Sequence, residues 1–508
     1  MKKMIKKINM AMLSMVILLV SCTNLDEEIF GSLSPENYYQ TEEEALSSLV
    51  GVYQRMREVM NYNDSYRVFL LGTDEFIIPA LDTGGWFDGG KFHEFTIHQV
   101  SATNSAINGA WNSIFGVIGA ANSVLESFEN SPQAANLKPQ IAEVRGLRAY
   151  AYFMALDLWG NVPIFTDARV NPSNLPSTNS RLEVYNFVVS EMLLSIADLP
   201  SINSVNRAQY YPRFTKETMQ SALAIVYLNA EVYTGTPRWT EAVDMADAVI
   251  SSGGYRLEDN FIASFTANNN TSQELIMAGT IDPTLNAGGN QYLRGAMHPR
   301  HQLTFNLPFV PANGQKTFKI AVDRYEDNDV RKNYVYFGPQ LDSEGNPLTV
   351  ANNSSEQLVL IPIVNYTSVA HNEGYRVLKY VPDGNWVDRF SSNDIVFIRY
   401  SDVLLTKAEA LFRLSGGADA RALELVNSVR ARSNATPLVT LTLQDIEDER
   451  AREFLWEGSR RRDMIRFGSY FNSTWKFKTS VTPQWRGIYP IPQNQLNGNP
   501  NLVQNPNY

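Results

Sequence analysis

The fold is decided by residues 215–252, which read TKETMQSALAIVYLNAEVYTGTPRWTEAVDMADAVISS. Small and apolar side chains recur at helical spacing on both sides of a Thr-Gly-Thr-Pro break at 234–237. They are Met219, Ala222, Leu223, Val226 and Ala230 before the break, and Trp239, Ala242, Val243, Ala246, Val249 and Ile250 after it. Alanines on facing stripes let two helices approach closely. The stretch therefore predicts a pair of helices joined by a short turn.

Residues 401–414 and 419–432 repeat this pattern, which is typical of a tetratricopeptide-like helical scaffold. Further helices are expected over 41–53, 108–128, 139–159 and 181–199. We therefore predict a mainly α fold.

Residues 260–400 differ from the rest of the chain because they are rich in Asn, Gly, Pro and Tyr. Only short runs at 357–363, 375–381 and 395–400 resemble strands. Long irregular segments in a compact protein usually carry function. We expect this segment to be the ligand-facing part, laid over the helical scaffold.

Composition excludes several classes of protein. The 508 residues are 44% hydrophobic and 19% charged, which is typical of a globular chain. The net charge is −10, and the first 21 residues hold four lysines and no acid, so the remainder is more acidic still. Such a body is a poor match for nucleic acid. The single cysteine excludes an internal disulfide and any cysteine-based metal cluster.

The amino terminus has the pattern of a lipoprotein signal peptide. Lysines within 2–7 precede an apolar run over 8–20, which is too short to span a bilayer, and Cys22 follows directly after Ser21. We expect residues 1–21 to be removed and Cys22 to carry fatty acyl chains such as palmitate. An ordinary secretory signal with an accidental cysteine is the alternative. The acidic run 26–28 resembles the surface-export signal of Bacteroidetes lipoproteins, or is a solvated tether.

Five stretches carry a resemblance to a known family. They are RAYAYFMALDLWGNVP (148–163), IRYSDVLLTKAEA (398–410), ERAREFLWEGSRRRDMIRFG (449–468), YPIP (489–492) and QNPNY (504–508). With the lipoprotein signal, they resemble the SusD/RagB family of nutrient-binding outer-membrane lipoproteins. The resemblance implies one SusD-like domain over 22–508, with an N-terminal part of about 22–235 and a C-terminal part of about 270–508.

The resemblance also implies a function. The protein is expected to be a non-catalytic binder that captures oligosaccharides at the cell surface and passes them to a SusC-like TonB-dependent outer-membrane transporter. Binding of peptides or other protein-derived nutrients is an alternative within the family. A surface glycoside hydrolase and a periplasmic helical-repeat scaffold are further alternatives.

The charged residues of these motifs are predicted to build the scaffold. We interpret Arg399, Asp402 and Glu409 as partners in ion pairs. We expect Asp448–Arg452 and Glu457–Arg461 to be i, i+4 pairs on an exposed helix. The run 460–462 is expected to form a solvated or salt-bridged face.

Signals of catalysis are absent from the sequence. It holds no G-x-S-x-G, G-x-x-x-x-G-K-[ST] or H-E-x-x-H motif. His93 and His98 lie in a strand-like stretch, and His298 and His301 lie in a loop that offers little for a metal. We expect no cofactor, although oxygen atoms of residues 282–286 leave a structural calcium open.

The candidate ligand site is the loop ALDTGGWFDGG at 80–90. Apolar faces of sugars stack on aromatic rings, so Trp86 and Phe87 between glycines are predicted contacts. Asp88, with Asp74 and Glu75, is a predicted partner of sugar hydroxyls. In the alternative interpretation, Trp86 folds back to plug the loop.

Three further candidates lie in the irregular segment. Asn290 and Tyr292 follow a glycine pair, and Trp386 follows an Asp-Gly-Asn turn. The tryptophans on helical patterns are instead expected in the core: Trp111, Trp159, Trp239 and Trp456.

Overall fold

The computed structural model describes residues 42–61, 64–282, 289–350, 353–382, 384 and 386–508. The expected signal peptide over 1–21 and the expected acylation site Cys22 lie outside these residues. Within them, no helix combines the length and apolar character that a membrane crossing requires.

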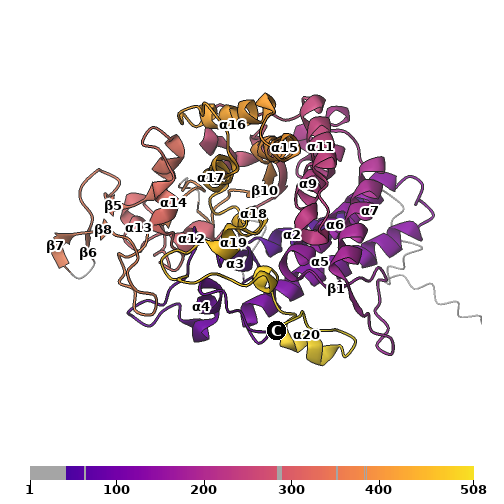
Figure 1. Ribbon diagram of the computed structural model, residues 1–508, viewed down its shortest axis with the longest axis horizontal. Helices are drawn as coiled ribbons and strands as arrows, with labels where there is room; N and C mark the ends of the chain where they lie inside the picture. Colours follow the sequence, from indigo (N-terminus) through magenta and orange to yellow (C-terminus); the bar gives the residue numbers. More distant parts are fainter. Residues whose placement is uncertain (1–41, 62–63, 283–288, 351–352, 383, 385) are drawn as a thin grey trace, which may run out of the picture.

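A stack of neighbouring helices forms one half of the molecule, drawn in indigo to magenta in Figure 1. The predicted pair is present as α9 (Lys216–Leu228) and α11 (Trp239–Ser252), which pack against each other. The stack continues through α5 (Ser105–Glu129), α6 (Lys138–Trp159) and α7 (Arg181–Asp198), each packed on the next. The mainly α architecture is confirmed.

The C-terminal helices extend this stack. Helix α15 (Tyr400–Ser415) packs on α11, and α16 (Ala420–Arg432) packs on α15, as the repeated pattern predicts. Helices α17 (Leu443–Glu453) and α18 (Arg460–Phe467) follow, and α2 (Glu42–Val59) packs on α5 and α6. The shorter helices are α3 (Asp64–Leu70), α4 (Lys91–Thr96), α8 (Arg207–Tyr210), α10 (Ala230–Thr234), α19 (Ser469–Asn472) and α20 (Gln493–Gly498).

Large aromatic residues fill the interface between helices. Trp111 of α5 meets Trp159 of α6 edge to face, with ring centroids 5.0 Å apart. Both side chains are buried, as is Trp456, and Trp239 packs against the same core while partly buried. The predicted core role of these four tryptophans is confirmed.

The irregular segment lies at the opposite side of the molecule, drawn in salmon in Figure 1, and its strands pair only two at a time. Each strand-like run contains a strand, but part of the segment is helical. The antiparallel pairs are β3 (Leu275–Gly279) with β10 (Ile395–Arg399), β4 (Val335–Tyr336) with β9 (Arg376–Val377), β5 (Gly338–Pro339) with β8 (Val359–Leu360), and β6 (Thr349–Val350) with β7 (Asn353–Gln357). The short helices are α12 (Tyr292–Ala296), α13 (His301–Thr304) and α14 (Lys319–Asp323). A further pair, β1 (Val162–Pro163) with β2 (Thr178–Asn179), follows α6.

Buried ion pairs join the irregular segment to the C-terminal helices. Arg399 at the end of β10 contacts carboxylate oxygens of Glu274, Glu453 and Glu457 at 2.7, 2.5 and 2.8 Å. Asp402 pairs with Arg450, and Glu409 pairs with Arg413 and Arg466. The interpretation of Arg399, Asp402 and Glu409 as scaffold ion pairs is therefore confirmed.

Two expectations about neighbouring charges are wrong. Arg452 pairs with Glu449, and Arg461 donates to the carbonyls of Asp157 and Gly487, so neither uses its i−4 acid. The i, i+4 rule holds for an exposed helix, whereas these side chains are buried and bond to distant segments. For the run 460–462, Arg460 follows the salt-bridged alternative, because it is buried and pairs with Asp74 and Glu447.

Candidate functional site

The glycine-rich loop leaves the core at a bridge to the irregular segment. Leu81 bridges Val369, and the amide of Asp82 donates to the carbonyl of Val369 at 3.0 Å. The backbone then takes positive φ values at three glycines and at Trp86 (65°) and Asp88 (44°) before α4 begins. Non-glycine residues adopt such values only where their surroundings hold them.

Trp86 is held from three sides. Its Nε1–H donates to the carbonyl of Ala312 at 2.9 Å, and the Arg67 guanidinium lies 5.5 Å from the ring centroid. A Cβ added at Gly314 would lie 2.3 Å from the ring, so the indole rests directly on that backbone. Trp86 is thus half-buried and folded back, as the alternative interpretation proposed, and it positions the loop.

Phe87 is the aromatic residue that the loop presents to solvent. Its side chain is 55% exposed, and Asp88 beside it is also exposed. A single exposed ring is common on protein surfaces, so Phe87 is a candidate contact because it lies on the loop that Trp86 holds in place. Of the residues of this loop that were predicted to contact a sugar, Phe87 and Asp88 are therefore the ones that a ligand can reach.

Trp386 lies near the same loop because one segment contacts both indoles. Its ring meets Phe309 edge to face with centroids 5.0 Å apart, and its Nε1–H has no acceptor among the described residues. Only two residues lie between Phe309 and Ala312, the acceptor of Trp86, which is a span of at most about 11 Å. Exposed apolar side chains flank Trp386 and Phe309, so we define an aromatic surface that comprises Trp86, Phe87, Phe309, Val310, Trp386 and Val387.

Two predicted contacts are not accessible. Tyr292 is 6% exposed and donates its hydroxyl to the carbonyl of Trp456, and Asn290 is 2% exposed and donates to the carbonyl of Asn393. Both side chains complete the core beneath the irregular segment. A ligand cannot reach them, so they leave the set of candidate contacts.

Asp74 and Glu75 are likewise internal and do not face a ligand. Burial would raise the pKa of Asp74, but Arg460 and Arg324 hold it well below its usual range. Burial raises the pKa of Glu75 to about 8, and its Oε1 accepts the amide of Trp456 at 2.9 Å. Asp74 and Glu75 precede the loop in sequence, but this proximity did not correctly predict that they face a ligand.

No metal centre is evident in the described part of the chain. It holds no group of three or more His, Cys, Asp or Glu residues placed to share an ion. His98 lies after helix α4 instead of in a strand, and it is buried against Tyr470. Most of the proposed calcium segment, 283–286, lies outside the described residues.

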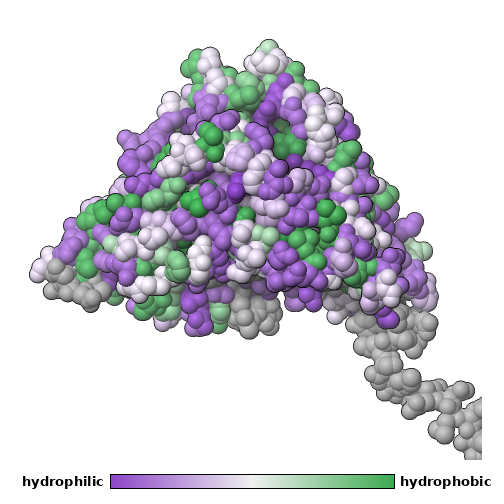
Figure 2. Space-filling view, turned by 60° about the horizontal axis from the view of Figure 1, so that its bottom comes forward, coloured by the Kyte–Doolittle hydropathy of each residue, from purple (hydrophilic) through white to green (hydrophobic). Residues whose placement is uncertain are grey.

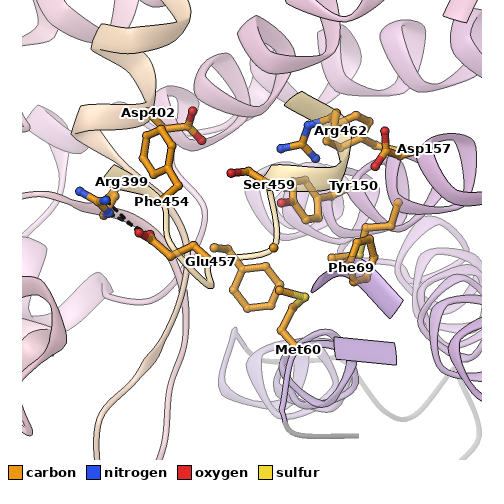
Figure 3. Close-up of a pocket in the computed structure, with 14 residues that line it drawn as sticks. Met60, Phe69, Tyr150, Asp157, Arg399, Asp402, Phe454, Glu457, Ser459 and Arg462 are labelled. Atoms are coloured by element: carbon orange, nitrogen blue, oxygen red, sulfur yellow. Dashed lines mark hydrogen bonds and ion pairs between the residues drawn. The ribbon is translucent and has the colours of Figure 1, made fainter. Parts of the chain in front are cut away.

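A small cavity of about 40 Å³ lies where β10 meets the segment 454–462 (Figure 3). Tyr150, Asp402, Ser459 and Arg462 line it, and Arg399 binds Glu457 at its edge. This volume suits one or a few buried waters, and the polar lining can hold them. The cavity is too small for a sugar ring, so we interpret the residues that line it as structural.

One face of the molecule mixes hydrophobic and polar residues. Figure 2 shows hydrophobic residues in small separate groups among polar ones. Such a face offers isolated stacking contacts beside hydrogen-bonding groups.

The fold defines a class: proteins built on a stack of helices, with an irregular segment laid against it. The chain belongs to the SusD family. The family model "SusD family" matches residues 252–508, and "Starch-binding associating with outer membrane" matches residues 41–228.

Relatives and solved structures agree with this assignment. The starch-binding protein SusD of Bacteroides thetaiotaomicron is 30% identical over 436 residues, 76% of each chain. A SusD-like protein of Bacteroides ovatus is 27% identical over 78% of this chain and 72% of its own. Among solved structures, surface glycan-binding protein A of B. thetaiotaomicron in complex with laminarihexaose has a TM-score of 0.75 at 22% identity, covering 91% of this chain and 99% of that one.

Proposed function

We propose that this protein is a lipid-anchored, non-catalytic receptor that captures oligosaccharides outside the cell. The single observation that carries the proposal is Phe87, more than half exposed on a loop that Trp86 fixes in place. Relatives with this fold include proteins named for binding starch and laminarin. The glycine-rich loop and Trp386 thus form the proposed contact surface.

The surface suits reversible binding. Two or three stacking contacts of about 1 kcal/mol each, with hydrogen bonds offset by desolvation, give a Kd in roughly the micromolar to millimolar range. A receptor that hands its cargo onward must release it, so this range fits the role.

The proposed pathway follows from the family and the amino terminus. Acylated Cys22 anchors the protein to the outer membrane, facing the exterior. A SusC-like TonB-dependent transporter receives the oligosaccharide. The description of the N-terminal family, which names an association with the outer membrane, supports this location.

Affinity electrophoresis of residues 23–508 against a polysaccharide panel tests the proposal, with a peptide pool as the matched alternative ligand. We expect retardation by at least one polysaccharide, no binding of peptides and no release of reducing sugar. Binding of peptides alone would show that the protein captures protein-derived nutrients instead of oligosaccharides. Release of reducing sugar would show that it is an enzyme.

A further inference from the structure

One histidine of the irregular segment, His371, is connected through its backbone to the residues that support Trp86. His371 is half-buried and follows Val369, which bridges Leu81 at the base of the glycine-rich loop. Its carbonyl accepts from the Asn313 side chain at 3.2 Å. Asn313 itself lies between Ala312 and Gly314, the two residues on which Trp86 rests. His371 is therefore tied to the same backbone that positions the loop.

A chain of hydrogen bonds fixes which nitrogen of His371 carries the proton. The amide of Arg300 donates to Nδ1 of His298 at 3.0 Å, so the neutral His298 ring carries its proton on Nε2. That Nε2 lies 3.1 Å from Nδ1 of His371 and donates to it. Because Nδ1 of His371 accepts, its own proton lies on Nε2. No acceptor among the described residues binds this Nε2–H.

The charges around His371 favour its neutral form. Burial lowers the pKa of His371; Asp82 and Glu356 oppose this effect, while Lys316 and Arg376 reinforce it. Both of these cations are fully buried. Protonation would also place an Nδ1–H against the Nε2–H of His298. The neutral ring of His371 therefore donates through Nε2, while its Nδ1 accepts the hydrogen bond from His298.

We propose that His371 contacts the ligand, and that His298 is a positioning residue that presets the Nε2–H of His371 as a hydrogen-bond donor to a sugar hydroxyl oxygen. This inference rests on the proposed function, because it assigns a polar contact beside the aromatic surface. Stacking fixes where a sugar ring lies but does not select its hydroxyl pattern. A fixed donor beside the stacking residues adds that selection.

A matched pair of variants tests the contact. His371→Phe keeps a flat ring without the donor, and His371→Gln returns an N–H donor. With the tightest saccharide of the panel, we expect His371→Phe to weaken binding about fivefold and His371→Gln to recover part of the loss. Equal affinity of the wild type and both variants would overturn the inference.

The positioning role has its own readout. Long-range ¹⁵N–¹H NMR of the free wild-type protein at pH 8 should show His371 as the Nε2–H tautomer. In His298→Phe at the same pH, we expect a mixture of tautomers and weaker binding. An Nδ1–H tautomer in the wild type would overturn the inference. If the wild type binds no saccharide, the proposed function fails, whatever the tautomer.

Discussion

Gly314 is the residue on which the geometry of the glycine-rich loop depends. Replacing Gly314 with alanine would place a Cβ 2.3 Å from the Trp86 ring, so the indole must move and the hydrogen bond to Ala312 must break. We expect Gly314→Ala to weaken oligosaccharide binding at least fivefold and to lower the melting temperature, as measured by calorimetry.

Gly119 provides the matched control for this substitution. It lies within α5, and an added Cβ would meet nothing within 4 Å. Gly119→Ala is expected to leave binding unchanged and to stabilise the helix by up to about 1 kcal/mol. Equal effects of the two substitutions on binding would contradict the role of Gly314.

At the residue scale, the sequence predicted a loop with aromatic residues but not which ring is presented. The clustered glycines indicate the loop, whereas the anchoring of Trp86 depends on Ala312, more than 200 positions away. Asn290 and Tyr292 were misassigned because an Asn, Gly and Tyr composition carries no information on burial. His371 has no local signal, since its role depends on His298.

At the scale of elements, buried ion pairs join β10 to α17. Removing Arg399 takes one of two cations from the buried carboxylate of Glu274 and one of three from that of Glu453, which keep Arg432 as a shared partner. Loss of one partner in a buried pair costs about 3–5 kcal/mol. We expect Arg399→Met to lower the free energy of unfolding in urea by about 3 kcal/mol or more.

Arg421 provides the exposed counterpart. Its side chain is 61% exposed and pairs with Asp419 at the start of α16. Arg421→Met should leave the free energy of unfolding nearly unchanged, because solvent screens an exposed pair. A comparable loss in both variants would show that burial does not decide the strength of these pairs.

Helices were predictable because apolar periodicity is a local property. The stripes of α9 and α11, and of α15 and α16, were sufficient to place both pairs. Ion-pair partners were not predictable, because neighbours in sequence point to different segments once the helix is buried. The strands of the irregular segment are only two to five residues long, too short for a reliable period.

At the scale of the whole molecule, the proposed lipid anchor should decide where the protein is located without affecting its affinity for saccharide. Cys22→Ala removes the residue that we propose to be acylated and changes no residue of the described body. We expect this variant to leave the outer-membrane fraction while the purified protein binds saccharide with wild-type affinity. Retention in that fraction, seen by blotting of separated membranes, would contradict the lipid anchor.

The central claim is that the exposed ring of Phe87, on a loop that Trp86 holds in place, binds carbohydrate. Isothermal titration calorimetry of Phe87→Ala tests this claim most directly. Val439→Ala is the control, because this 90% exposed side chain lies between α16 and α17. With the tightest saccharide of the panel, we predict that Phe87→Ala weakens binding about fivefold at an unchanged melting temperature, and that Val439→Ala binds like the wild type. Wild-type affinity in Phe87→Ala would contradict the account.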